Sequence, residues 1–391
     1  MKRFMGGMLF ISILLSGISI GSVNVGSATM KIAPPVIDTN YQAMAEIAAA
    51  NLAGHMRFET DGRVWVERTE GSPLASASWG ASLAGMAHDR FNQLAPGAEN
   101  GLDSEQIAVL VGAYWDADEE SLGYAASLGD KDHPWTSRYI DDGMWAAELR
   151  MLQYEHQGRS GDVPDETAPA EAQAMLDIAT RNYDPKTGLV FWKDQRQEAK
   201  KELETRNHSL STVAAVTAIE LALMINRISP GERYRDNLDF AMEAYDGLRR
   251  SMRDEDNLYR EGIHANGEVN RSKYPYVQGV MIHVGGLLHE ATRQPLYLAE
   301  AERTAVAALR FYNPEHLGRS DQMFVAVYFD RLYEFRNMTI DEGLRASIHE
   351  TILAHTKHHA ALLESPVEIA PYGFRSSQLH MASLAALLLQ I

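Results

Sequence analysis

The sequence predicts an all-α protein, built as an (α/α)6 barrel of about twelve helices. Apolar residues recur at helical spacing through most of the chain, and segments with strand-like alternation are scarce. No Pro/Gly-rich linker or change of composition divides the chain. Twelve helices in one uninterrupted chain suggest six consecutive hairpins, which can close into a ring with an inner layer of buried helices. A solenoid of helix pairs is the structural alternative, but the sequence lacks the repeated consensus typical of one.

A signal peptide is expected at residues 1–28. The chain begins with the basic segment Met1-Lys2-Arg3, continues with a mostly apolar run at 8–20, and offers small residues for cleavage at 26–28. The apolar run is shorter than the roughly 20 residues that a membrane span needs. An uncleaved N-terminal anchor is the alternative. We therefore expect an exported protein (secreted, periplasmic or cell-surface) in which residues 29–391 form a single (α/α)6-barrel domain without a membrane span.

Composition narrows the classes of partner and chemistry. The formal net charge is −17, from 36 Lys and Arg against 53 Asp and Glu, so a nucleic-acid partner is not expected. The absence of cysteine excludes disulfides, thiolate metal sites and a Cys nucleophile. Two acidic segments, 116–120 and 254–257, lack the full spacing of a calcium loop. We expect no metal and no cofactor, and a monomer.

The helices are predicted from apolar positions three or four residues apart between capping or breaking residues. In the segment 207–227, for example, Leu210, Val213 and Leu221 share one face. The segments 276–292 and 376–390 are apolar nearly all round, which is typical of helices buried between neighbours. The twelve predicted helices span residues 40–57, 73–93, 103–117, 140–157, 167–182, 207–227, 233–252, 276–292, 294–312, 321–336, 341–360 and 376–390.

Four longer connections between these helices are both aromatic and polar. They span residues 118–139, 183–206, 253–275 and 361–375. Binding residues often lie on loops that a rigid scaffold positions. If the connections gather on one rim of the barrel, their aromatic rings can stack on sugar rings, although packing among surface loops would use the same residues.

Two adjacent carboxylates, Asp141 and Asp142, open the helix predicted at 140–157. One interpretation is capping, because Asp is favoured at the N-cap and in the first turn. The other is a glycosidase pair, whose carboxyl groups lie roughly 5–5.5 Å apart when configuration is retained. Neighbouring residues at a helix start splay about 100° apart and can reach opposite sides of one bond. Repulsion between them would keep one protonated as the acid. The spacing permits both interpretations.

The segment around this pair resembles the Tyr-x-Asp-Asp-x-x-Trp signature of glycoside hydrolase family 76, the endo-α-1,6-mannanases. Four further stretches resemble motifs of that family in the same order. The matching segments are Ser78-Trp79-Gly80, Tyr139-Ile140-Asp141-Asp142-Gly143-Met144-Trp145, Gly188 to Trp192 with Arg206 to Ser209, Tyr276-Val277-Gln278-Gly279, and Asp321 to Val325.

The resemblance covers nearly the whole predicted domain and implies an (α/α)6 barrel that hydrolyses α-1,6-mannosidic bonds with retention of configuration. It implies that Asp141 is the nucleophile and Asp142 the general acid/base. It also implies an oligo- or polysaccharide substrate, with further residues that contact sugar hydroxyls or line the substrate site. These implied substrate-binding residues are Trp79, Tyr139, Trp145, Trp192, Asn207, Tyr276 and Gln278.

Three departures from the family pattern bear on specificity. Val277 replaces an expected Asn, Asp321-Gln322 replaces an expected Lys-Gly, and Ala147 stands where an aromatic residue is common.

Alternatives to hydrolysis of mannan rest on the fold class alone. An unsaturated-uronyl hydrolase, a sugar epimerase or a transglycosylase could use a similar barrel. An epimerase of this kind would need paired histidines facing the centre, for which His208 and His283 are the candidates. A non-catalytic glycan-binding protein could use the same aromatic residues.

Overall fold

A computed structural model of the chain describes the greater part of the predicted domain. The described residues are 46, 49, 57–60, 63–66, 78–94, 102–117, 122–126, 138–161, 163–199, 201, 207–228 and 232–363. All of them belong to one compact unit, Ile37–Ile391. The predicted signal peptide at 1–28, the helix at 376–390 and most of the helix at 40–57 lie outside the described residues and stay predictions.

Helices dominate the described part of the chain, at positions close to those predicted. Two single-turn helices, α6 (Gln195–Glu198) and α11 (Pro314–Arg319), were not predicted. The other helices are α2 (Ser78–Leu94), α3 (Ser104–Gly112), α4 (Ile140–Ser160), α5 (Ala168–Arg181), α7 (Thr212–Ile228), α8 (Glu232–Ser251), α9 (Pro275–Thr292), α10 (Pro295–Phe311), α12 (Gln322–Met338) and α13 (Glu342–Leu363).

Local sequence explains several helix ends. Asp103 and Gln106 form a capping box at the start of α3, in which each side chain accepts the other residue's backbone N–H. Pro275 and Pro295 occupy the first positions of α9 and α10, where the missing N–H costs no hydrogen bond. Gly161 ends α4 with a φ of 86°, a left-handed conformation that glycine adopts without strain.

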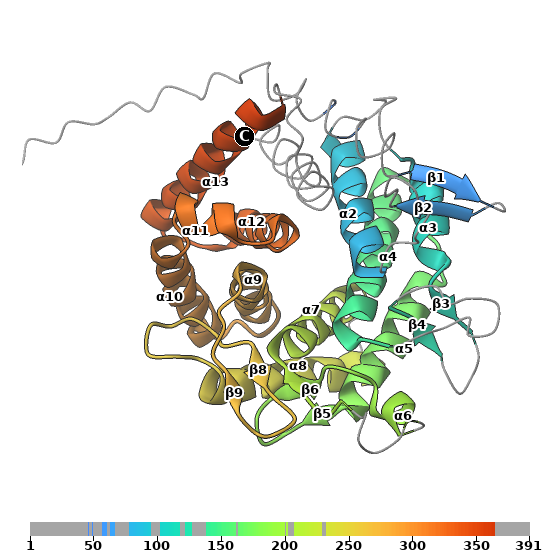
Figure 1. Cartoon of the computed structure of the whole chain (residues 1–391), viewed down its shortest axis with the longest axis horizontal. Coiled ribbons are helices and arrows are strands. Elements are labelled where there is room, and N and C mark those ends of the chain that lie inside the picture. The colour runs from blue at the N-terminus through green and yellow to red at the C-terminus, as the bar shows by residue number, and fades with distance from the viewer. Residues whose placement is uncertain are drawn as a thin grey trace, which may run out of the picture. The chain divides into compact units, whose positions relative to one another are not determined.

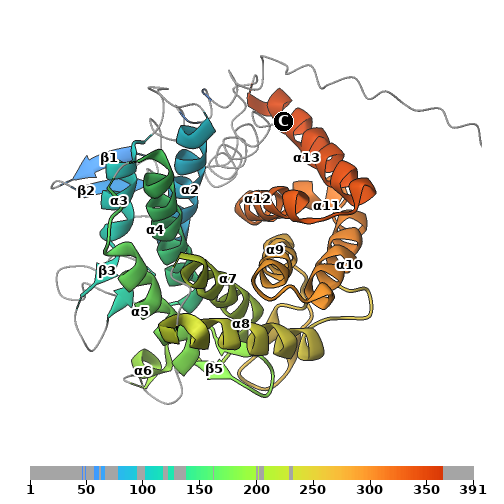
Figure 2. The ribbon, with the colours of Figure 1, turned by 180° about the vertical axis from the view of Figure 1, so that it is seen from behind.

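The helices form an inner and an outer layer (Figures 1 and 2). Helices α2, α4, α7, α9 and α12 lie side by side in that order as the inner layer. Each packs against an outer helix that follows it in sequence, which is α3, α5, α8, α10 or α13. Most residues of α7 and α9 are buried, and for α9 this is expected from a segment that is apolar nearly all round. The predicted all-α fold built from helical hairpins is therefore confirmed.

Short strands pair the predicted connections with one another. An antiparallel sheet in the order β5-β6-β7-β8-β9 joins the connection after α5 to the one after α8. Two hairpins, β1-β2 and β3-β4, lie earlier in the chain. The strands are β1 (Arg57–Thr60), β2 (Arg63–Val66), β3 (Trp115–Asp116), β4 (Gly123–Tyr124), β5 (Tyr183–Asp184), β6 (Leu189–Phe191), β7 (Leu210–Ser211), β8 (Gly262–Ile263) and β9 (Val269–Asn270).

These strands correct three predicted helix boundaries. The helix predicted at 103–117 ends at Gly112, because residues 115–116 pair with β4. The helix predicted at 207–227 begins only at Thr212, because residues 210–211 lie between β6 and β8 in the sheet. Arg57, the last residue of the helix predicted at 40–57, pairs with Val66 in a hairpin. In each case inter-strand hydrogen bonds outweigh the local helical pattern.

Among the described residues, no helix combines the length and apolar character needed to cross a membrane.

Candidate active site

The two aspartates lie in the first turn of α4 and do not occupy its N-cap. The N-cap residue is Tyr139, which is extended (φ −84°, ψ 129°) and whose side chain makes no capping hydrogen bond. Backbone N–H groups at 141 and 142 stabilise the charged Asp141 carboxylate at this helix end. The pair is thus available for chemistry beyond that of an N-cap.

The sheet brings Trp192 onto Asp141. Tyr139 and Lys193 form an isolated antiparallel bridge, and the backbone N–H of Ile140 donates to the carbonyl of Trp192 at 2.9 Å. The indole Nε1 of Trp192 then donates to Asp141 Oδ2 at 3.2 Å. The other oxygen, Asp141 Oδ1, is buried and has no hydrogen-bond partner among the described residues. Asp141 is therefore oriented through one oxygen and has the other free to react.

Burial raises the pKa of both aspartates, and the two shifts have different causes. It raises the pKa of Asp141 to about 6, against the opposing effects of the Trp192 hydrogen bond and the backbone N–H groups. Burial, together with the adjacent Asp141 charge, raises the pKa of Asp142 well above its usual range. Both causes act on Asp142, so a proton shared by the pair favours Asp142 over Asp141. A retaining glycosidase needs one ionised carboxyl group as the nucleophile and one protonated carboxyl group as the acid.

A third carboxyl group, Glu261, was not predicted from the sequence. Burial and the charge of Asp141 raise the pKa of Glu261 to about 8, and its Oε2 is buried without a hydrogen-bond partner. The backbone N–H of Thr212 donates to the carbonyl of Glu261 at 2.8 Å, which fixes this residue beside the first turn of α7. A neutral carboxyl group next to Asp141 can both donate and accept a hydrogen bond.

The position of Glu261 depends on the glycine that follows it. A Cβ atom at Gly262 would lie 2.1 Å from the carbonyl oxygen of Leu210 in β7. Only glycine therefore allows β8 to pair with β7 at this point. In the sequence Glu261 is one of several acidic residues in a polar connection, and nothing local distinguishes it from Glu255 or Glu268.

Aromatic residues from other inner helices lie near the carboxylates. Tyr276, in the first turn of α9, stacks on Phe324 of α12 with centroids 4.2 Å apart and planes at 17°. Trp79, at the start of α2, contacts the same Phe324 at 5.5 Å. Burial and the charges of Glu261, Asp141 and Asp142 raise the pKa of Tyr276. The first turns of α2, α9 and α12 thus meet at Phe324.

A second aromatic pair flanks Asp141. The rings of Tyr139 and Trp192 are 4.8 Å apart, and the Lys193 ammonium lies 4.3 Å from the centroid of the Tyr139 ring. The Trp192 side chain is 38% exposed, so its ring is accessible for stacking on a sugar.

Two predicted binding residues, Gln278 and Trp145, have buried side chains. Gln278 is fully buried, and its amide bonds to Tyr259 in both directions, accepting from the backbone N–H at 2.8 Å and donating to the carbonyl at 2.9 Å. These two hydrogen bonds fix the backbone at Tyr259, in the connection that carries Glu261. Trp145 is 1% exposed in the core, with Arg331 at 5.8 Å from its ring centroid. Both side chains are therefore enclosed by protein atoms.

Asn207 is half-buried and shapes its own turn. The side-chain Oδ1 of Asn207 accepts the backbone N–H of Ser209 at 2.8 Å. The backbone N–H of Asn207 donates to Glu198 Oε2 at 2.7 Å. The carbonyl of Ser209 in turn accepts the backbone N–H of Trp192 at 2.8 Å. Asn207 thus supports the strand pairing next to Trp192.

The two candidate histidines have separate surroundings. His283 Nδ1 lies 2.5 Å from Glu220 on the neighbouring inner helix, whereas His208 is exposed and contacts the Phe191 ring at 6.4 Å. Among the described residues, the two histidines therefore have no interaction partner in common. Among the same residues, no group of three or more His, Asp or Glu side chains has the geometry to hold a metal ion.

Glu261 supports a prediction that does not depend on activity. A carboxyl group that is neutral in the folded state at pH 7 but ionised in the unfolded chain lowers stability as pH rises from about 4.5 to about 8. Glu261→Gln should therefore raise the free energy of unfolding by about 1–3 kcal/mol at pH 8 and change it little at pH 4.5. Urea denaturation at both pH values measures this.

The matched control for that measurement is Glu255→Gln, because Glu255 is exposed in the same connection. It should leave stability unchanged at both pH values. A loss of stability at pH 8 in Glu261→Gln would show that Glu261 is buried as a charged group.

Comparison with known proteins supports the fold. No protein-family profile matches the sequence, and no curated protein is similar to it. A family 76 glycoside hydrolase from a bovine Bacteroides thetaiotaomicron strain superposes with a TM-score of 0.69 at 18% identity, covering 90% of this chain and 78% of that chain. Dfg5 from Chaetomium thermophilum, in complex with glucosamine, gives 0.63 at 15% identity over 90% and 89%.

A third similar structure bears on the aspartate pair. It is an inactive variant of an α-1,6-mannanase from a Salegentibacter species, in complex with α-1,6-mannotriose, in which two consecutive aspartates are replaced by asparagine. Its TM-score is 0.68 at 16% identity, over 90% of this chain and 99% of that chain. This chain therefore has the fold of family 76 glycoside hydrolases, as the sequence motifs predicted.

Proposed function

We propose that this protein is an exported, retaining glycoside hydrolase that cleaves α-1,6-mannosidic linkages. One observation carries the proposal: two consecutive aspartates open an inner helix, and the Trp192 indole holds Asp141 Oδ2 while Asp141 Oδ1 has no hydrogen-bond partner among the described residues. The inactive mannanase of the same fold, which lacks two consecutive aspartates, supports the assignment. The exposed ring of Trp192 beside Asp141 supports a sugar as the substrate.

The proposed reaction has two steps with balanced proton transfers. In the first, Asp141 Oδ1 attacks the anomeric carbon while the bond to the leaving oxygen breaks, and Asp142 gives its proton to that oxygen. A glycosyl ester of Asp141 remains. In the second, Asp142 removes a proton from water, which attacks the anomeric carbon and releases Asp141 as a carboxylate. The Trp192 N–H holds Oδ2 throughout, leaving Oδ1 as the nucleophile.

The departures from the family pattern carry little weight for mannan specificity. Val277 and Ala147 are fully buried in the core and present no side chain to a substrate. Asp321 caps α12 by accepting the backbone N–H of Met323 at 2.9 Å, so its carboxylate has a local structural role. Family-like specificity is therefore compatible with all three.

The proposal is tested by product analysis. The purified protein is incubated with linear α-1,6-mannan and, separately, with an α-1,2-mannan and an α-1,6-glucan. We expect oligosaccharides only from the α-1,6-mannan, and NMR at early times should show new reducing ends in the α configuration. Inverted products, or tight calorimetric binding of mannan without products, would contradict retaining hydrolysis. Products longer than the starting chains would identify a transglycosylase.

The pKa of Asp141 sets the acid side of the expected pH profile. Because the nucleophile must be ionised, kcat/KM should fall below about pH 6, where Asp141 becomes protonated. Trp192→Phe keeps an aromatic ring but removes the hydrogen bond that lowers this pKa, so its acid limb should move to higher pH. Steady-state kinetics from pH 4 to 9 measure both limbs. An unmoved acid limb in Trp192→Phe would assign that limb to another group.

A further inference from the structure

A lysine side chain lies beside the aromatic pair that flanks Asp141. The Lys193 Nζ is 4.3 Å from the centroid of the Tyr139 ring. The Tyr139 and Trp192 rings are 4.8 Å apart, and the Trp192 indole donates to Asp141 Oδ2 at 3.2 Å. We call the Tyr139 and Trp192 rings together the aromatic platform. A sugar that stacks on the exposed Trp192 ring therefore has an ammonium group within reach of a long, flexible side chain.

Hydrogen bonds hold the backbone of this lysine in place. Tyr139 and Lys193 form an isolated antiparallel bridge. The Lys193 carbonyl accepts from Gln195 Nε2 at 2.9 Å, and the next backbone N–H, that of Asp194, donates to the Arg138 carbonyl at 3.2 Å. The Lys193 ammonium can therefore move from the Tyr139 ring to a bound ligand by rotation of its own side chain, without a change in the backbone.

No acid holds the Lys193 ammonium. Among the described residues Lys193 forms no ion pair, and its ammonium contacts the Tyr139 ring instead. A cation–π contact is weaker than a charge-assisted hydrogen bond to an anion. An anionic group that reaches the aromatic platform therefore offers this lysine a better partner than the one it has.

The acids that follow Lys193 in the sequence are buried and already paired. Asp194 and Glu198 are 1% and 2% exposed. Asp194 accepts from Arg181 at 2.9 Å. Glu198 is within electrostatic range of Lys193, but its two oxygens accept from Lys201 at 2.6 Å and from a backbone N–H at 2.7 Å. These carboxylates therefore do not compete with a ligand for Lys193.

The exposed charge of this segment is consequently positive. Lys193 is half-buried, and Arg196 is exposed and forms no ion pair among the described residues. Asp141 is on the same platform, but it meets Nε1 of Trp192, whereas Lys193 lies over the Tyr139 ring. An anionic group on a substrate is therefore repelled near Asp141 and attracted at Lys193.

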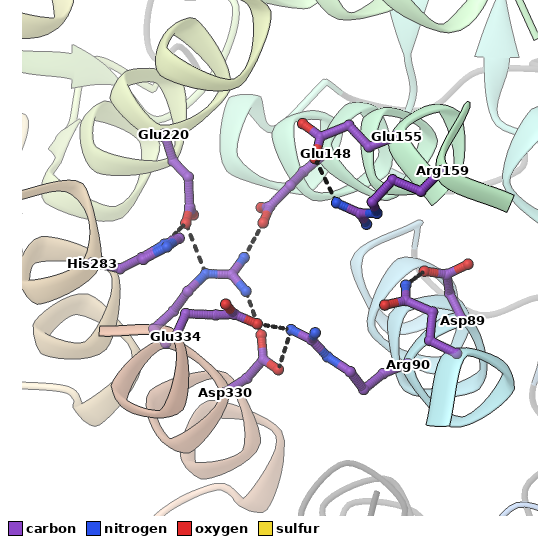
Figure 3. Close-up of polar contacts among 11 residues, drawn as sticks. Asp89, Arg90, Glu148, Glu155, Arg159, Glu220, His283, Asp330 and Glu334 are labelled. Atoms are coloured by element: carbon purple, nitrogen blue, oxygen red, sulfur yellow. Dashed lines mark hydrogen bonds and ion pairs between the residues drawn. The ribbon is translucent and has the colours of Figure 1, made fainter. Parts of the chain in front are cut away.

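The buried Arg331 differs from Lys193, because neighbouring acids neutralise it (Figure 3). Its guanidinium pairs with Glu148 of α4, with Glu220 of α7 at 2.8 Å, and with the adjacent Asp330. An anion would be repelled by these carboxylates. The Arg331 cluster therefore does not compete with the aromatic platform for an anionic ligand.

We propose that the substrate site prefers a sugar that carries an anionic substituent, either a phosphate ester or a carboxylate. The sugar ring stacks on Trp192, and the Lys193 ammonium donates to the anionic oxygens. This inference rests on the proposed function, because it names the substrate class of the same site. It adds Lys193 as a residue that determines specificity.

Isothermal titration calorimetry of the purified protein with simple sugars tests this preference. Mannose 6-phosphate and mannose 1-phosphate carry a phosphate at different positions, mannuronate carries a carboxylate, and mannose is the neutral reference. We expect at least one anionic sugar to bind about tenfold or more tightly than mannose at low salt. The sugar that binds best shows whether the substituent is a phosphate or a carboxylate.

Inorganic phosphate is the control for the sugar ring. It should bind at least about tenfold more weakly than the best anionic sugar, because it cannot stack on Trp192. Equal affinity for mannose and for all three anionic sugars would overturn the inference. Inorganic phosphate binding as tightly as the phosphorylated sugar would overturn it as well, since the site would then hold an adventitious ion only.

Three variants assign the preference to Lys193. Lys193→Gln removes the charge and should lower the affinity for the anionic sugar to that for mannose. Lys193→Arg keeps the charge and should retain most of the preference. Lys186→Gln removes an exposed lysine from the turn between β5 and β6 and should leave the preference unchanged. Full preference in a folded Lys193→Gln variant would refute the role of Lys193.

A salt titration of the wild-type protein decides the matter if Lys193→Gln does not fold. Sodium chloride raised from about 0.1 M to about 1 M shortens the Debye length from about 10 Å to about 3 Å and should remove most of the preference. A preference that does not depend on salt would contradict the inference. Hydrolysis of neutral α-1,6-mannan decides the proposed function separately. Products without a preference for anionic sugars would keep the hydrolase and reject this inference, whereas the preference without products would reject the reaction and keep the charged-sugar site.

Discussion

Replacing Asp141 with asparagine should lower kcat on α-1,6-mannan by about 10⁴-fold. The amide cannot form the glycosyl ester, so the covalent step of the proposed reaction is lost. Folding should be preserved, since Asp141 Oδ2 accepts only one side-chain hydrogen bond and an amide oxygen can accept it as well. Reducing-sugar release under saturating mannan measures the effect.

Azide distinguishes a variant that lacks only the nucleophile from a variant that has lost its folded active site. In Asp141→Ala, azide can enter the space left by the carboxylate and attack an aryl mannoside directly, giving a glycosyl azide of inverted configuration. Asp239→Asn removes an exposed carboxylate from α8 and should leave kcat unchanged. Near-wild-type turnover in Asp141→Asn would end its assignment as the nucleophile.

Replacing Asp142 with asparagine should lower kcat on mannan by about 10²–10⁴-fold, the usual contribution of a general acid. The effect should depend on the leaving group. A sugar alcohol leaves only when it is protonated, whereas a dinitrophenolate leaves without help. The first step on a dinitrophenyl mannoside should therefore stay fast, while release of the glycosyl ester becomes slow because no base activates water.

A burst of dinitrophenolate followed by slow turnover is the expected kinetic signature of Asp142→Asn. Azide should accelerate the slow phase in Asp142→Ala and give a glycosyl azide of retained configuration, opposite to the product of Asp141→Ala. Equal losses on mannan and on the activated mannoside would contradict the role of Asp142 as acid/base. The two variants together therefore assign the roles by stereochemistry.

The sequence located the helices well because helical periodicity is a local property. Helix α4 begins at Ile140 as predicted, and the aspartate pair was found together with it. The sheet was not predicted, because strands of two or three residues are too short to show an alternating pattern. Glu261 was missed for the same reason, since its position depends on the pairing of β7 and β8.

The family resemblance implied substrate-binding roles for some residues whose side chains the structure buries. Gln278 and Trp145 belong to recognisable segments, but the structure buries both side chains behind the site. The motif gives the position of a residue in the chain, and only packing decides whether its side chain faces a ligand or the core. Glu220, His283 and Arg331 carry no local signal of their association, because they come from three different helices.

The sequence by itself determined that this is a helical protein with an acid pair at the start of one helix, since both features depend on residues close in the chain. Only the tertiary structure decided which side chains surround that pair and that buried ion pairs of Arg331 join α12 to α4 and α7. The reason is that both depend on contacts between distant residues. Trp192 meets Asp141 across 51 positions and Arg331 meets Glu148 across 183, and such contacts follow from how the helices and strands pack.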